Sequence, residues 1–149
     1  MSQPQARSVN ATREPTTAAR LRLLLACAHY RLRDAMRTFL SEEGIDVVET
    51  ASSEGVLQAV ADGPPVDVAV MDFQVGYVNG LETAKELRVV TPATRVILMS
   101  VSDGDLIRDM GRREGAVVVT HGCKPAVLLA EVLRVRSQDA GEMGRAVGQ

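Results

Sequence analysis

The sequence contains no tryptophan, and its only other aromatic residues are Phe39, Phe73, Tyr30 and Tyr77. Its hydrophobic content of 46% therefore comes mainly from Val, Leu and Ala. Aliphatic residues of this kind fill parallel strands that are buried between helices. A chain of 149 residues can also bury a core without disulfides or a structural metal. The composition therefore favours one aliphatic α/β domain.

Cysteine, long apolar runs and clustered positive charge are also scarce. Two cysteines are too few for a disulfide framework and fit a reducing compartment. No apolar run is long enough for a membrane span, and residues 1–20 lack the apolar stretch of a secretion signal. We therefore expect a cytoplasmic protein without membrane contact. The formal net charge is −2, and no dense Lys/Arg block indicates direct nucleic-acid binding.

The ends of the chain differ in composition from its middle. Residues 1–19 are rich in Ser, Thr, Gln, Pro and Ala and lack a sustained apolar period, so we expect a disordered N-terminal tail. Residues 137–149 have a similar character and are expected to form a disordered C-terminal tail. One domain is predicted between them, over residues 20–136.

Short apolar runs alternate with helix-period segments throughout this domain. The runs predict strands at 21–26, 45–50, 66–71, 96–99 and 116–120, and the second, half-polar run is typical of a sheet edge. Stop signals at Gly44, Gly63-Pro64-Pro65 and Gly115 end three of the intervening helices, and a loop is expected between Asp72 and Gly80. Five strands and five helices in alternation predict an α/β fold with a doubly wound, five-stranded parallel sheet.

Functional residues of doubly wound sheets lie beyond the carboxyl ends of the strands. The residues predicted at these positions are listed here in chain order: Cys27, Ala28, His29, Asp72, Ser100, His121, Gly122, Cys123 and Lys124. All cysteines and histidines of the chain are in this set.

Several stretches of the chain share a family pattern. They are LRLLLACAHYRLRDAM, VDVAVMDFQVGYVNGLETAKELR and TRVILMS, together with the spacing from Asp72 to Gly80-Leu81-Glu82 and on to Ser100. On these residues, positions 21–135 resemble the receiver domain of bacterial response regulators, particularly the branch joined to helix-turn-helix output domains. The resemblance implies a flavodoxin-like (βα)5 fold and a role in two-component or phosphorelay signal transduction.

The resemblance also implies site roles. Asp72 matches the phosphoacceptor of the family and Ser100 its switch residue. The positions of the acid pair that holds Mg²⁺ carry Cys27 and Ala28, and the position of the family lysine carries Gly122, with Lys124 as an alternative cation. Mg²⁺ is therefore implied only if the domain is phosphorylated, and no other cofactor is expected.

These departures lead us to expect an atypical, pseudo-receiver-like domain that signals by protein–protein contact. Its partner would be a histidine kinase, an output protein or a second copy of itself in a homodimer. The first alternative is a conventional receiver phosphorylated on Asp72, and for that residue a purely structural role stays open. The second is a metal or thiol-redox sensor that uses Cys27, His29, His121 and Cys123. No nucleophile–base pair is visible, so we expect no enzyme and no catalytic residue.

Overall fold

A computed structural model describes residues 20–75, 78–101, 104–120 and 122–137 of the chain. Its main sheet has five parallel strands: β2 (Arg22–Ala26), β3 (Asp46–Thr50), β4 (Val68–Asp72), β7 (Arg95–Ser100) and β8 (Ala116–Thr120). Their order across the sheet is β3-β2-β4-β7-β8. The predicted doubly wound sheet is therefore confirmed, with β3 at an edge as its half-polar sequence indicated. The predicted tails, residues 1–19 and 137–149, lie outside the described ranges except for Ser137, which is helical.

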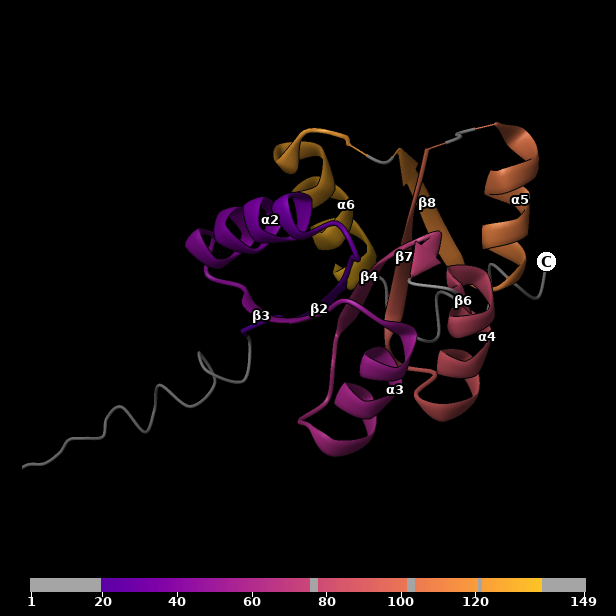
Figure 1. The fold of residues 1–149 in the computed structure, drawn as a ribbon, viewed down its shortest axis with the longest axis horizontal. Coiled ribbons are helices and arrows are strands. Elements are labelled where there is room, and N and C mark those ends of the chain that lie inside the picture. Colours follow the sequence, from indigo (N-terminus) through magenta and orange to yellow (C-terminus); the bar gives the residue numbers. More distant parts are fainter. Residues whose placement is uncertain (1–19, 76–77, 102–103, 121, 138–149) are drawn as a thin grey trace, which may run out of the picture.

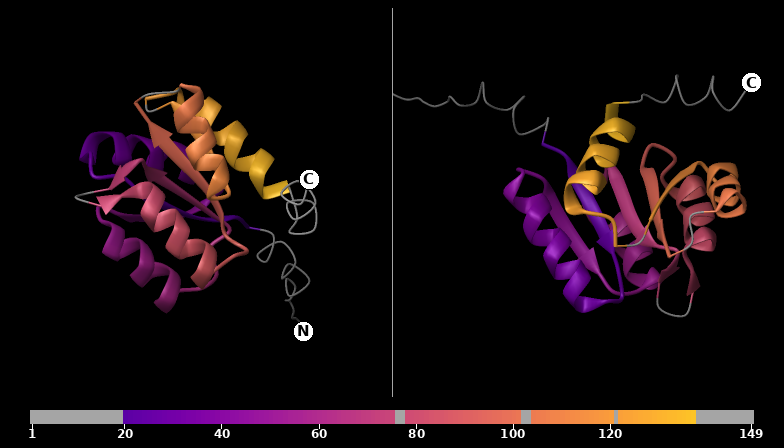
Figure 2. Two further views of the ribbon diagram at one scale, coloured as in Figure 1. Left: turned by 90° about the vertical axis from the view of Figure 1, so that its right-hand side faces the viewer. Right: turned by 90° about the horizontal axis from the view of Figure 1, so that it is seen from above.

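Five helices cover the two faces of this sheet: α2 (Tyr30–Glu42), α3 (Ser53–Asp62), α4 (Gly80–Val90), α5 (Asp105–Arg113) and α6 (Pro125–Ser137). Helices α2 and α6 pack on one face, and α3, α4 and α5 pack on the other (Figures 1 and 2). None of the helices in the described part of the chain is both long enough and apolar enough to cross a bilayer.

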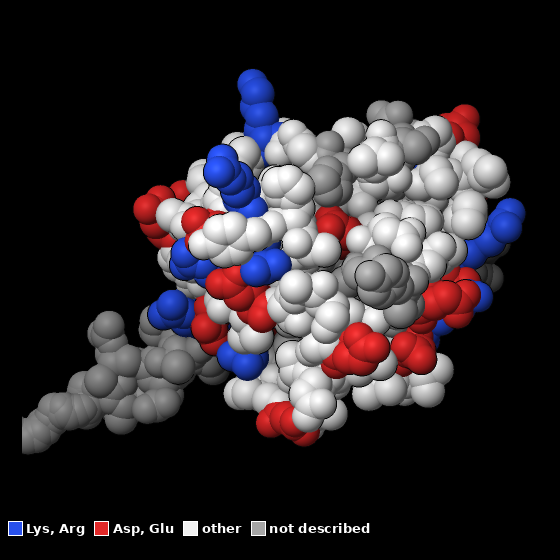
Figure 3. Space-filling model, in the orientation of Figure 1, with Lys and Arg blue, Asp and Glu red and all other residues white. Residues whose placement is uncertain are grey.

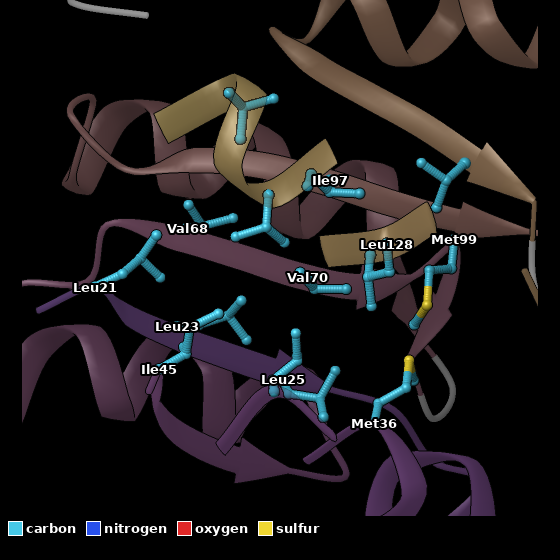
Figure 4. Close-up of a cluster of buried hydrophobic side chains, with 14 of the residues drawn as sticks. Leu21, Leu23, Leu25, Met36, Ile45, Val68, Val70, Ile97, Met99 and Leu128 are labelled. Carbon is cyan, nitrogen blue, oxygen red and sulfur yellow. The ribbon is translucent and has the colours of Figure 1, made fainter. Parts of the chain in front are cut away.

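The two faces bury separate aliphatic cores. The first lies under α2 and α6 and includes Leu23, Leu25, Met36, Ile97 and Leu128, whose side chains point into the space between sheet and helices (Figure 4). The second lies under α3, α4 and α5 and is built in the same way from strand and helix residues. Because alternate strand residues point to opposite faces, each central strand contributes to both cores, and the strands are held rigidly between them.

The predicted helix boundaries follow from local chemistry. The Ser52 hydroxyl accepts a hydrogen bond from the Gly55 N–H at 3.0 Å and so caps the start of α3. After α2, Gly44 has a φ of 88°, a left-handed conformation in which other residues are strained. Strand β8 has the predicted bounds, and the other four strands differ from the predicted ones by one or two residues at their ends.

One segment was predicted incorrectly. The residues between Asp72 and Gly80 were expected to form a plain loop, but they contain a short antiparallel pair, β5 (Gln74–Val75) and β6 (Val78–Asn79). Strands of two residues are too short to show any periodicity in the sequence. The pair ends where the Asn79 side chain accepts a hydrogen bond from the Leu81 N–H at 2.7 Å and begins α4.

Candidate functional site

The carboxyl ends of β2, β4 and β7 bring three of the predicted residues to one edge of the sheet. Asp72 and Ser100 are the last residues of β4 and β7, and Cys27 follows β2 directly. Parallel pairing sets Ala26 opposite Met71 and Asp72 opposite Met99. All three predicted residues are buried: Cys27 is 0%, Ser100 5% and Asp72 7% exposed. The strands alone therefore place a carboxylate, a thiol and a hydroxyl at this buried edge.

The Asp72 carboxylate is tied to the end of β2 by the main chain. Its Oδ2 accepts a hydrogen bond from the Ala28 N–H at 3.3 Å. On the other side, the Phe73 N–H donates to the Met99 carbonyl at 2.7 Å and continues the pairing of β4 with β7. These bonds fix the strand ends around Asp72. A carboxylate in this position accepts hydrogen bonds and stabilises the edge as well as offering a nucleophilic oxygen.

Cys27 stands where the resemblance would place the first acid of the pair. Its N–H donates to the Thr50 carbonyl at 3.1 Å, and its thiol donates to the His29 carbonyl at 3.6 Å. Burial, followed by the negative charge of Asp72, raises the pKa of the Cys27 thiol from 9.0 to about 11. The thiol is therefore protonated at neutral pH, and the position beside Asp72 carries no charge.

The donor set does not fit the Mg²⁺ ion that the resemblance implies. Mg²⁺ binds hard oxygen ligands, chiefly carboxylates, together with water. Residue 27 offers a buried neutral thiol, residue 28 offers an exposed methyl group, and the main-chain N–H of Ala28 already donates to the carboxylate of Asp72. Within the described ranges, no three His, Cys, Asp or Glu side chains are grouped so that they could hold a metal.

At the position of the family lysine, this chain also differs from the family. Gly122 has a φ of 83° and open space around it, so a lysine there would adopt a strained backbone conformation. Lys124 is exposed, and its carbonyl accepts hydrogen bonds from the N–H groups of Val127 and Leu128 at the start of α6. Among the described residues, no ion pair or hydrogen bond joins Lys124 to Asp72.

The structure describes three of the four cysteine and histidine residues predicted for a metal or redox site. His29 caps α2: its Nδ1 accepts a hydrogen bond from the Leu32 N–H at 3.3 Å. Cys123 is half-buried and packs against the same core as Cys27, while His121 lies outside the described ranges. Both cysteines are free thiols, and burial raises the pKa of Cys123 as well. A capping role explains His29 without a metal.

Two groups near the site were not predicted. The first is the Ala28 N–H, which has no side-chain signature in the sequence. The second is Arg33 on α2, whose Nη1 donates to the Cys27 carbonyl at 2.6 Å and whose Nε lies 3.0 Å from Glu49 Oε1. Arg33 thus joins α2 to the ends of β2 and β3. The turn from β2 into α2, with Arg33 six residues after Cys27, was the available signal for it.

Comparisons with known proteins agree with this geometry. The family described as the response regulator receiver domain matches residues 24–132. The chain is similar to the transcriptional activator protein ExaE of Pseudomonas putida, with 33% identity over 116 residues that cover 76% of this chain and 54% of ExaE. It therefore spans about half the length of that relative.

Two further proteins are similar to this chain, one in sequence and one in structure. Sporulation initiation phosphotransferase F of Bacillus subtilis is 26% identical over 105 residues, which cover 70% of this chain and 82% of that protein. In structure, the chain is similar to a CheY-like response regulator receiver domain protein from Methanospirillum hungatei. The TM-score is 0.74 at 16% identity, with coverage of 86% of this chain and 99% of the other. At that identity the likeness shows the fold alone.

Proposed function

The chain belongs to the response-regulator receiver family of two-component signalling, and within it we propose an atypical receiver that signals by protein contact with little or no Mg²⁺-dependent phosphorylation. The observation that carries this proposal is the pair of uncharged side chains, Cys27 and Ala28, at the positions of the family's acid pair. Where the family has an acid pair, the main-chain N–H of Ala28 and the protonated thiol of Cys27 face the carboxylate.

The energetic argument concerns charge. Phosphoryl transfer depends mainly on positioning and on cations that neutralise the phosphoryl oxygens. The anchors for Mg²⁺ are absent at residues 27 and 28, and glycine replaces the lysine at 122. Each contact worth about 1.4 kcal/mol changes a rate roughly tenfold, so the loss of two such contacts should slow transfer by orders of magnitude. Binding, which needs no such stabilisation, is the activity that this domain retains.

The proposal is tested by intact-protein mass spectrometry after incubation with acetyl phosphate and Mg²⁺. We expect no gain of about 80 Da, the mass of a phosphoryl group, over a time that fully labels a conventional receiver run in parallel. Asp72→Asn provides the matched control. A stoichiometric gain that Asp72→Asn abolishes would overturn the proposal and establish the second candidate, a conventional receiver.

That second candidate has one specific observation in its favour. Asp72 and Ser100 lie at the ends of adjacent strands, the arrangement that the family uses for its phosphoacceptor and its switch hydroxyl. Gly80 also lies against the β4 end, where a Cβ would be 2.3 Å from the Asp72 carbonyl oxygen. The same features would also be needed to hold the strand ends in place in a domain that only binds partners. We therefore assign a binding role, without enzymatic turnover, and a partner from the same signalling system.

A further inference from the structure

A hollow between α3 and α4 lies on the second face of the sheet. It has a volume of about 410 Å³ and is lined by Leu57 and Ala61 of α3 and by Glu86, Val89 and Val90 of α4. Val89 is 83% and Val90 59% exposed. Two adjacent valines with this exposure are not explained by packing within the described part of the chain. We call this hollow the α3–α4 groove.

The rim of the α3–α4 groove is acidic. Glu54 and Asp62 on α3 and Glu82 and Glu86 on α4 are all exposed. The one exposed lysine among them, Lys85, is paired with Glu82 at 3.4 Å. Figure 3 shows acidic side chains gathered over α3 and α4, where Lys and Arg are sparse. Of these four acidic residues, which we call the acidic rim, Glu86 lines the hollow itself, whereas Glu54 and Glu82 lie in the first turns of α3 and α4. The groove therefore combines an apolar floor with carboxylates on both of the helices that border it.

The helix ends add to this charge. The groove reaches the last turns of α3 and α4, where the helix macrodipole is negative and attracts cations. The last turn of α3 contains no basic residue. In α4 the basic residue of the last turn is Arg88, and its guanidinium bonds to the Arg113 carbonyl at 2.9 Å and pairs with Glu114. The Arg22 guanidinium also lies beside the end of α3, 3.2 Å from the position that a Cβ of Gly63 would take, so the negative charge of the groove comes mainly from its carboxylates.

We propose that the α3–α4 groove docks a cationic amphipathic helix of a partner protein. Such a helix carries apolar residues at i, i+3 or i+4 and i+7, which would fill the floor, and Lys or Arg beside them, which would meet the acidic rim. The inference rests on the proposed signalling by contact and specifies one partner surface. Because α3 and α4 run antiparallel to the strands, the carboxyl ends of these two helices lie at the amino edge of the sheet, away from Asp72.

A second copy of the chain is the competing occupant. Helix α6 exposes Val127 and Leu133 and carries Arg134 and Arg136 near its end, with Arg134 paired to Glu131 at 2.8 Å. Seating α6 of one copy on the groove of another is a heterologous contact, which leaves an unused groove and an unused α6 at the ends of any assembly. Such a contact would produce self-association that grows with concentration.

The test uses the full chain and a helical Leu/Lys peptide of roughly 18 residues, long enough to be helical on binding. A Leu/Glu peptide with the same apolar pattern is the control ligand. We expect the Leu/Lys peptide to bind, with amide NMR shifts on α3 and α4, and the Leu/Glu peptide to bind at least about tenfold more weakly. Val89→Glu should weaken the Leu/Lys complex by about tenfold or more.

The matched control variant is Leu106→Glu, because Leu106 is a similarly exposed apolar residue (69%) on α5. It should leave the affinity unchanged. Both positions are exposed, so thermal melts should show that both variants fold. The proposal is overturned if the Leu/Lys peptide does not bind, if the two peptides bind alike, if the two variants lose affinity equally, or if Val89→Glu abolishes only self-association. Phosphorylation of Asp72 would overturn the proposed function, whereas the peptide result would stand.

Discussion

Two substitutions, Cys27→Asp and Ala28→Asp, would place carboxylates beside Asp72 at the positions where the family has its acid pair. Cys27 is fully buried beside Asp72, so a carboxylate there would be a like charge in a site with little water. Ala28 is exposed, so the second carboxylate carries little cost of burial. The double variant, which carries both substitutions, restores the acid pair that the family uses for Mg²⁺.

The magnitude follows from the burial of residue 27. An uncompensated buried charge lowers the free energy of unfolding by roughly 3–5 kcal/mol. Mg²⁺ that binds only the folded double variant, at about 100 times its Kd, returns about 2.7 kcal/mol. For a domain of this size, about 1 kcal/mol corresponds to roughly 4 °C in Tm. The double variant should therefore melt more than ten degrees lower in EDTA (about 12–20 °C) and recover about 10 °C with Mg²⁺.

The assay is thermal unfolding of four samples, the original chain and the double variant, each with EDTA and with excess Mg²⁺. The original chain should show the same Tm in both buffers. Ala28→Asp alone, which adds an exposed charge only, is the control for general destabilisation. A rise of several degrees for the original chain with Mg²⁺ would refute the argument that its donor set does not fit the ion. A double variant that ignores Mg²⁺ would refute the assigned positions of the acid pair.

Four further predictions concern buried groups of the domain. At about pH 8 a thiol reagent should label half-buried Cys123 first and Cys27 only on unfolding, as mass spectrometry can show. Because the folded pKa of Cys27 is raised from 9.0 to about 11, its contribution to stability should also be complete below pH 9 and decline toward pH 11 in urea titrations. Thr83→Val should leave the free energy of unfolding unchanged or raise it by about 1 kcal/mol, because the buried Thr83 Oγ1 has no partner among the described residues. A decrease in the free energy of unfolding by more than about 1 kcal/mol would show that Thr83 makes a hydrogen bond. Gly80→Ala should lower it by about 1–3 kcal/mol, since its Cβ would lie 2.3 Å from the carbonyl oxygen of Asp72, and an unchanged urea midpoint would contradict that clash.

The sequence predicted the sheet well because its strands are continuous aliphatic runs bounded by strong stop signals. The run at Val68–Asp72 is buried at every residue, whereas β3 has no fully buried residue, as expected of an edge strand. The β5 and β6 pair could not be predicted, because its register depends on how the chain returns to Gly80. There the Gly80 N–H donates to the Phe73 carbonyl at 2.5 Å, a contact that the tertiary fold determines.

The candidate site was predictable only for residues that follow strands. Asp72 and Ser100 lie where the strand ends placed them, and Cys27 and Ala28 lie beside Asp72. The donor that holds Asp72 is a main-chain N–H, which every residue except proline carries, so no residue type indicates it. Arg33 reaches the Cys27 carbonyl only because α2 packs across the ends of β2 and β3, and that packing angle is not a property of any single segment.

The state of the protonated thiol bears on how such a domain can respond to a signal. Cys27 stays neutral across the physiological pH range, because burial and Asp72 hold its pKa near 11. The Ala28 N–H already donates to Asp72, so the carboxylate is stabilised without a metal. A ligand changes the state of such a domain only if it binds the two states with different affinities. In the proposed docking, the exposed valines and the acidic rim of the α3–α4 groove would supply both apolar area and charge for such a difference, far from the carboxyl edge of the sheet.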